Sequence, residues 1–197
     1  PYGYTPGPSL YVKYFTSHDR VRFTLDCLGG QGRIGEFFYT PLVGPDLLCG
    51  ILAKATGRSV RDFAAEHLFT PLEVTAPDTV LLKSEQDQSA FNAATDINGW
   101  VADSAGTHSG GWGLTLSARD MARSGQLCLN GGIWNERRIV SAQWLEESMK
   151  EHSRWKEMNL PYGYLWWLRD DRQKAFAAMG DGGNAIYFNS QKRLVVS

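Results

Sequence analysis

The sequence lacks an excess of charge of one sign and lacks long hydrophobic runs. Twenty basic and 21 acidic residues leave a formal net charge of −1, so no basic surface for nucleic acid or anionic lipid is expected. No run of 18 apolar residues occurs, which excludes a transmembrane helix from this stretch. Hydrophobic residues nevertheless make up 43% of the 197 residues, so the chain can form a packed core as one domain or one lobe of a larger one.

Metal-binding and redox motifs are also absent. The sequence has neither a CxxC pair nor an HExxH motif, and its four histidines lie far apart. We therefore expect no metal and no cofactor. Cysteines are few and odd in number, and Cys49 and Cys128 lie among apolar neighbours, which favours buried thiols over disulfides.

The two ends of the sequence carry no recognisable terminal signal. Pro1–Tyr4 is neither an initiator methionine nor a signal peptide, and Leu194–Ser197 ends within a strand-like run. We interpret both ends as cut, so that the fold is incomplete at each. The compartment and the oligomeric state are unknown from the sequence.

The pattern of hydrophobic residues predicts helices first and strands last. Helices are expected over 44–56, ended by Gly57, and after three serine caps, Ser59, Ser117 and Ser141. The stretch 73–111 has no clear period. Short strands are expected at 164–168, 175–179, 185–188 and 193–196. This order predicts an α+β fold with an antiparallel sheet flanked by helices: one partial domain over 1–197, helical over about 40–155 and stranded over about 162–197.

Several short motifs allow both a structural and a chemical interpretation. Gly180–Asn184 is a hairpin turn or a place where a substrate backbone approaches a strand edge. Gly110–Leu114 marks tight loop packing or the lip of a site. The adjacent His108 and Ser109 are interpreted as loop residues, because neighbouring residues seldom point the same way. The single SxxK match, Ser153–Lys156, follows a helix instead of starting one, so we regard it as a chance match.

Taken in order, these segments resemble the serine β-lactamase-related and penicillin-binding-protein-like hydrolases of the class C β-lactamase/esterase type. The resemblance is carried by an ordered set of elements from about residue 20 onward: Phe37–Tyr39, Leu47–Gly57, Phe69–Leu72, Gly110–Leu114, Ser117–Arg123, Leu129–Trp134, Ile139–Ser141, Tyr162–Trp167 and Gly180–Asn184. It implies a β-lactamase/transpeptidase-like fold that acts on a small-molecule ester or amide, or on a peptide-like substrate, through an acyl-enzyme.

The resemblance also assigns roles to individual residues. Tyr39 would be the catalytic tyrosine that relays a proton, and Gly182 and Gly183 would lie on the strand that faces the substrate. Asp181 would bind substrate where relatives have Lys, His or Tyr, which disfavours a β-lactam carboxylate as ligand. Thr40–Pro41 departs from the Ser/Asn pair that follows the family's tyrosine, and the SxxK that supplies the serine nucleophile is missing upstream of Tyr39.

Two other interpretations of the same residues stay open. The first is a non-catalytic homologue that uses the cleft for binding or as a scaffold, favoured by Asp181 and by the residues after Tyr39. The second is an unrelated glycoside hydrolase, which would need two buried carboxylates close together.

Overall fold

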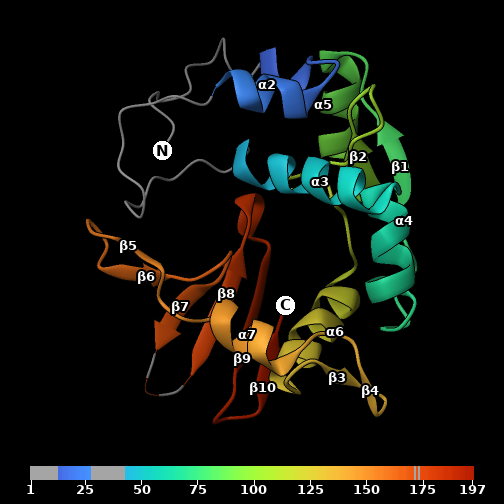
Figure 1. Ribbon diagram of the computed structural model, residues 1–197. Helices are drawn as coiled ribbons and strands as arrows, with labels where there is room; N and C mark the ends of the chain where they lie inside the picture. The colour runs from blue at the N-terminus through green and yellow to red at the C-terminus, as the bar shows by residue number, and fades with distance from the viewer. Residues whose placement is uncertain (1–12, 28–42, 171, 173) are drawn as a thin grey trace. The chain divides into compact units, whose positions relative to one another are not determined.

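The chain forms two compact units (Figure 1). The computed structural model describes residues 13–27, 43–170, 172 and 174–197. Of these, the first unit contains 13–27, 43–69 and Thr75–Leu116, and the second contains Thr70–Val74 and Ser117–Ser197. None of the helices in the described ranges is long and apolar enough to cross a membrane.

Capping side chains start most helices of the first unit. Its helices are α2 (Arg20–Asp26), α3 (Val43–Thr56), α4 (Val60–Ala64), which continues as the π-helix η1 (Ala65–Phe69), and α5 (Glu85–Ala93). The hydroxyl of Ser59 accepts a hydrogen bond from the amide of Asp62, which satisfies one of the free N–H groups at the start of α4. Gly57 ends α3 with φ +66°, a backbone conformation that glycine adopts without strain. The helices expected over 44–56 and after Ser59 are therefore confirmed.

The first unit also contains two parallel strands, which the sequence pattern did not reveal. β1 (Asp78–Leu81) pairs with β2 (Gly99–Ala102), with Asp78 opposite Gly99. All four residues of β2 are buried, so its side chains do not alternate between apolar and polar. Strands buried on both faces lack the period-two signal, which explains why the stretch 73–111 had no clear pattern.

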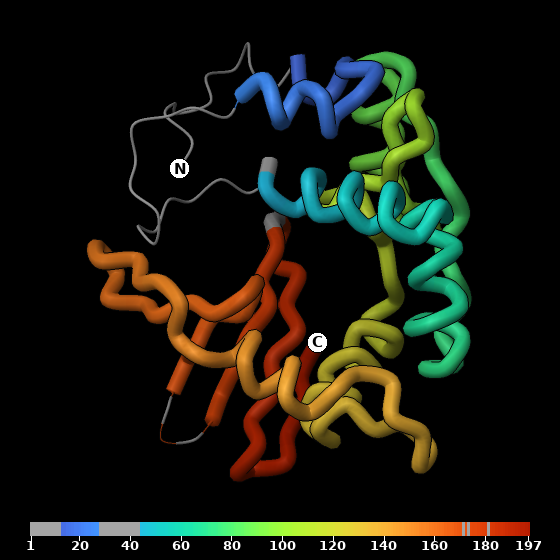
Figure 2. Tube along the Cα trace, viewed as in Figure 1, coloured from blue at the N-terminus to red at the C-terminus, as the bar shows by residue number. Residues whose placement is uncertain are grey.

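Six antiparallel strands dominate the second unit. β5 (Ser153–Trp155), β6 (Leu160–Tyr162), β7 (Trp167–Asp170), β8 (Ala175–Met179), β9 (Ala185–Asn189) and β10 (Leu194–Val196) lie side by side in chain order. Figure 2 follows this meander from orange to red. The sheet begins nine residues earlier than the expected 162, and the strand expected at 164–168 begins at Trp167, because Leu165 has φ +64° and interrupts the extended backbone.

Helix α6 (Ala118–Leu129) packs against one end of this sheet. At Gly125 an added Cβ would lie 2.7 Å from Val195 and 2.9 Å from Ile186, so only glycine lets the helix approach β9 and β10 this closely. The second unit also contains α7 (Ala142–Ser148), capped by Ser141, and the short hairpin β3 (Ile133–Trp134) and β4 (Arg137–Arg138). The fold class expected from the sequence, an α+β fold with helices flanking an antiparallel sheet, is confirmed.

Aromatic pairing fixes the register in the centre of the sheet. Phe176 on β8 lies directly opposite Phe188 on β9, with ring centroids 5.2 Å apart. Trp166 contacts the Phe188 ring edge-on at 5.4 Å, and Phe188 is only 1% exposed. Cross-strand aromatic pairs stabilise an antiparallel sheet beyond their area burial. They therefore hold β8 and β9 in the alignment that closes the glycine-rich turn between them.

Candidate active site

The glycine-rich segment 180–184 is the turn between β8 and β9. Met179 pairs with Ala185 at the last rung of the hairpin, and the amide of Gly180 donates to the carbonyl of Asn184 at 2.9 Å. Between them, Asp181–Gly183 form one turn of 3-10 helix, with φ +77° at Gly182 and +86° at Gly183. The two glycines expected to bind substrate therefore lie in the turn that precedes β9, and not within a strand.

This turn presents bare backbone to its surroundings. Gly182 and Gly183 are both exposed, and no atom lies within 4 Å of the position that a Cβ on Gly183 would occupy. Their positive φ excludes most other residues, so the turn keeps both its shape and its lack of side chains. The arrangement leaves room for a substrate backbone beside the end of the sheet.

The predicted proton-relay residue Tyr39 and its neighbours Thr40 and Pro41 lie outside the described residues. The backbone of Asp181 is described within the turn, whereas its side chain falls outside the description. The roles assigned to these residues thus stay predictions.

The start of α3 is anchored in the first unit by a buried carboxylate that the sequence analysis did not single out. Asp46 is 1% exposed and accepts hydrogen bonds from the hydroxyl of Tyr14 and, at 2.7 Å, from the amide of Gly110. Burial raises the pKa of Asp46, although the bond from Tyr14 opposes that shift. Burial, reinforced by the charge of Asp46, also raises the pKa of Tyr14, so this tyrosine is no proton donor near neutral pH.

A buried arginine completes the same cluster. Arg20 is 2% exposed, and its guanidinium carbon lies 5.3 Å from the ring centre of Tyr14 and 5.2 Å from that of Trp112. It donates to the hydroxyl of Ser109 at 2.5 Å, and its charge favours the ionised form of Asp46. Aromatic faces and an opposite charge are what a buried guanidinium needs to offset lost hydration. The cluster is a structural anchor.

The loop Gly110–Leu114 is a tightly packed segment of this anchor. An added Cβ at Gly110 would lie 2.5 Å from the carbonyl oxygen of Pro45, and one at Gly113, where φ is +75°, would lie 2.7 Å from Val101. Both glycines are therefore required by close approach of neighbouring atoms. The same burial raises the pKa of the Cys49 thiol to about 12, so Cys49 is not a thiolate nucleophile near neutral pH. Like Cys128, it is a free, partly buried cysteine.

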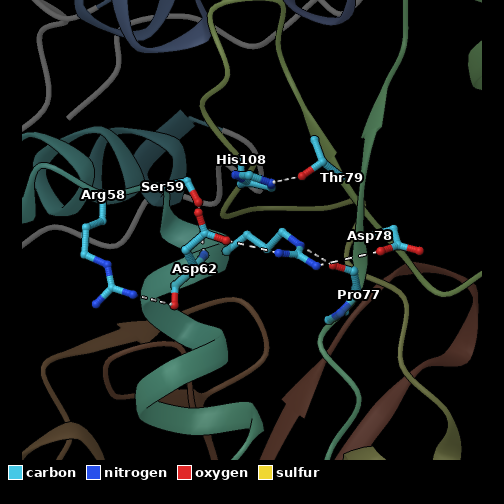
Figure 3. Close-up of polar contacts among 8 residues, drawn as sticks. Arg58, Ser59, Asp62, Pro77, Asp78, Thr79 and His108 are labelled. Atoms are coloured by element: carbon cyan, nitrogen blue, oxygen red, sulfur yellow. Dashed lines mark hydrogen bonds and ion pairs between the residues drawn. The ribbon is translucent and has the colours of Figure 1, made fainter.

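His108 and Ser109 do not form a nucleophile–base pair, as expected. Both are buried, but Nε2 of His108 lies 3.0 Å from the hydroxyl of Thr79 (Figure 3), while Ser109 binds Arg20. Burial and the charge of Arg61 lower the pKa of His108, which keeps its ring neutral. These side chains serve packing within the first unit.

The SxxK match is likewise structural. Ser153 begins β5 and Lys156 follows that strand, so the amine does not lie one helical turn from the hydroxyl. Since an activated serine needs its base within hydrogen-bond reach, this pair is not the catalytic motif of the family. The interpretation of Ser153–Lys156 as a chance match agrees with this geometry.

The two buried carboxylates that the structure describes, Asp46 and Asp103, do not form an acid/base pair for glycoside hydrolysis. Asp103 accepts hydrogen bonds from the amides of Arg20 and Thr107. Asp46 accepts hydrogen bonds from Tyr14 and Gly110. Both act as acceptors that hold loops in place. Among the residues that the structure describes, no three metal-binding side chains gather at one place.

Comparisons with known proteins converge on one family. The family model described as Beta-lactamase matches residues 35–197. A 6-aminohexanoate-dimer hydrolase of Paenarthrobacter ureafaciens is 25% identical over 183 residues, which cover 87% of this chain and 41% of that protein. The chain thus spans less than half the length of this curated relative.

Solved structures share the fold at low sequence identity. A putative 6-aminohexanoate-dimer hydrolase from Bacillus anthracis superposes over 100% of this chain and 50% of its own, with TM-score 0.70 and 20% identity. A family VIII carboxylesterase gives TM-score 0.62 at 17% identity, over 93% of this chain and 58% of its own. An octameric penicillin-binding protein homologue from Pyrococcus abyssi gives a TM-score of 0.52 at 16% sequence identity. That match covers 94% of this chain and 50% of the homologue. With the family model covering most of its length, this chain belongs to the β-lactamase family.

Proposed function

We propose that the protein carrying this chain is a serine hydrolase that cleaves a small ester or amide, or a peptide-like substrate, through an acyl-enzyme. In this proposal the nucleophilic serine comes from a segment outside these 197 residues. The observation that carries the proposal is the match of the family model over residues 35–197. The names of two relatives, a 6-aminohexanoate-dimer hydrolase and a carboxylesterase, support the same reaction type.

The chemistry divides between that external segment and this chain. The serine oxygen attacks the substrate carbonyl while its proton passes to a lysine one helical turn away. Tyr39 then relays a proton to the departing alcohol or amine, and water later releases the acyl group by the reverse transfer. The Gly182–Gly183 turn lies beside the carbonyl, where the absence of side chains leaves room for the substrate backbone.

The test is covalent labelling of the natural gene product that contains this chain. Incubation with a fluorophosphonate, followed by intact-mass measurement and peptide mapping, should give one adduct per molecule. We expect the adduct on a serine of an SxxK motif outside these 197 residues, and none after heat denaturation. Ser153→Ala is the matched control, because it removes the only SxxK serine of this chain and should leave labelling unchanged. An adduct on any serine of this chain would contradict the proposal.

A non-catalytic homologue is the second candidate. It is favoured by Thr40–Pro41 after Tyr39 and by Asp181 at the position where relatives have Lys, His or Tyr. The same experiment separates the two candidates. A folded gene product that shows neither an adduct nor ester hydrolysis, but still binds an unreactive substrate analogue, would be a binding protein and not an enzyme.

A further inference from the structure

One end of the six-stranded sheet carries an excess of positive charge. The turns after β7 and after β9, with the last two residues of β7, cover 169–174 and 190–193. They contain five basic and two acidic residues, which gives a net charge of +3, although the whole chain carries −1. The balanced composition of the sequence therefore does not reveal this local excess. The basic residues are Arg169, Arg172, Lys174, Lys192 and Arg193, and we call them the basic end of the sheet.

Hydrogen bonds hold the two turns side by side. The amide of Ser190 donates to the carbonyl of Lys174 at 3.1 Å, and the side-chain amide of Gln191 donates to the carbonyl of Arg172 at 2.5 Å. Figure 1 shows the ends of β7 and β9 on the same side of the sheet, opposite the glycine-rich turn 180–184. Cations that are far apart in the sequence thus lie on one surface.

The five basic side chains are exposed and carry unbalanced charge. None of them forms an ion pair with another residue in the part of the chain that the structure describes. Other arginines do form such pairs, for example Arg154 with Glu151. The described acid of these turns, Asp170, accepts a hydrogen bond from the amide of Arg172 at 2.9 Å, so it shapes the turn. The basic end therefore presents its charge to solvent.

Turn geometry does not explain two of these cations. Lys174 has φ +47° and Arg193 has φ +49°. A left-handed backbone strains most side chains, whereas glycine and asparagine adopt it at lower cost. Residues held in such a conformation point to a use for their side chains. The sequence thus places a cation in each turn where a less strained residue would close it.

We propose that the basic end is a docking surface for an anionic lipid bilayer. Hairpin turns at the end of a sheet meet a flat layer of lipid phosphates without needing a groove. Leu194, which is 43% exposed, follows Arg193, and an aliphatic side chain beside cations inserts between headgroups and acyl chains. Single-stranded nucleic acid is held by aromatic side chains that stack on bases, and the two turns contain none.

The size of the effect follows from the number of charges. Each lysine or arginine near an anionic leaflet strengthens binding by about fivefold. A net charge of +3 therefore predicts that anionic vesicles bind about a hundredfold more tightly than neutral ones. Because the side chains are exposed, high salt should screen most of this attraction.

The test is co-sedimentation of the natural gene product with phosphatidylcholine vesicles, with and without about 30% phosphatidylglycerol. The wild type should bind the anionic vesicles about a hundredfold more tightly and should dissociate from them in high salt. The double variant Lys192→Gln, Arg193→Gln should weaken this binding by about 25-fold, since it removes two of the cations.

The matched control is Arg119→Gln, Arg137→Gln. Both arginines are exposed, belong to the second unit and lie outside the two turns, so the control removes the same charge elsewhere. It should leave vesicle binding unchanged, and the urea midpoints of both double variants should match the wild type.

Four results would overturn the inference. They are equal affinity of the wild type for neutral and anionic vesicles, no binding to either, an equal loss in the control, and no loss in Lys192→Gln, Arg193→Gln. Binding of a DNA duplex without binding to vesicles would assign the basic end to nucleic acid and would overturn it too. None of these measurements depends on hydrolysis, so the proposed function stands or falls separately.

Discussion

A methyl group added at Gly183 tests whether the hairpin tip borders the substrate. In Gly183→Ala the new Cβ meets no atom within 4 Å, so packing does not change, but φ of +86° is strained for alanine. A left-handed backbone costs an L-residue about 1–2 kcal/mol. The variant should therefore lose about that much stability out of the roughly 5–15 kcal/mol of a typical domain, and it should remain folded.

The structure offers a control with the same strain at another place. Gly106 has φ +88° and likewise no atom within 4 Å of an added Cβ, but it lies in the loop after β2 of the first unit. Gly106→Ala should lose the same 1–2 kcal/mol. Urea unfolding followed by tryptophan fluorescence measures both variants, and equal midpoints would establish that their folding penalties match.

The two variants should differ in turnover of the natural gene product. Misplacing a substrate by about 1 Å lowers the rate by up to about a hundredfold, so Gly183→Ala should lower kcat/KM by about ten- to a hundredfold. Gly106→Ala should stay near the wild-type value. If both variants keep full activity, or both lose it equally, the hairpin tip does not border the substrate and the reasoning is refuted.

Two further predictions concern the buried anchor of the first unit. Gly110→Ala places a Cβ 2.5 Å from the carbonyl oxygen of Pro45 and should destabilise the protein by about 2–4 kcal/mol, measured by urea unfolding. Gly180→Ala is the control, because its Cβ would lie 3.8 Å from the Cβ of Asn184, and it should change the urea midpoint little. Because burial raises the pKa of Asp46, its proton stabilises the fold below the ordinary value of 3.8, and this contribution disappears as pH rises through the raised pKa. Asp46→Asn removes that titration, so the stability of the variant relative to wild type should improve as pH rises from 3.8 through the raised pKa. Urea unfolding of both proteins at several pH values measures this, and a difference in unfolding free energy that does not change with pH would contradict it.

Three of the helices that the sequence predicted begin at a local signal. Ser59, Ser117 and Ser141 each accept a hydrogen bond from the amide three residues later, as expected of N-caps. Such signals need no knowledge of the rest of the chain. By contrast, β2 is buried at every position, and β5 and β6 are three residues each, too short for a recognisable period.

Only the local features of the candidate site and the buried anchor could be predicted from the sequence. The turn at Gly180–Asn184 is a local feature, and its two positive φ angles agree with the glycines found there. The anchor is non-local, since Asp46 binds Tyr14 32 positions earlier and Gly110 64 positions later. The only feature of the anchor that the sequence indicated was the glycine run at 110. That run indicated close packing but not that Pro45 is the neighbour.

Burial and hydrogen bonding, and not residue type, identify Asp46 as a structural acid. Asp46 is 1% exposed and its oxygens accept hydrogen bonds from Tyr14 and Gly110, so both oxygens are already used within the fold. Asp181 lies in an exposed glycine turn closed by a backbone bond between Gly180 and Asn184. That backbone bond closes the turn whatever side chain stands at position 181.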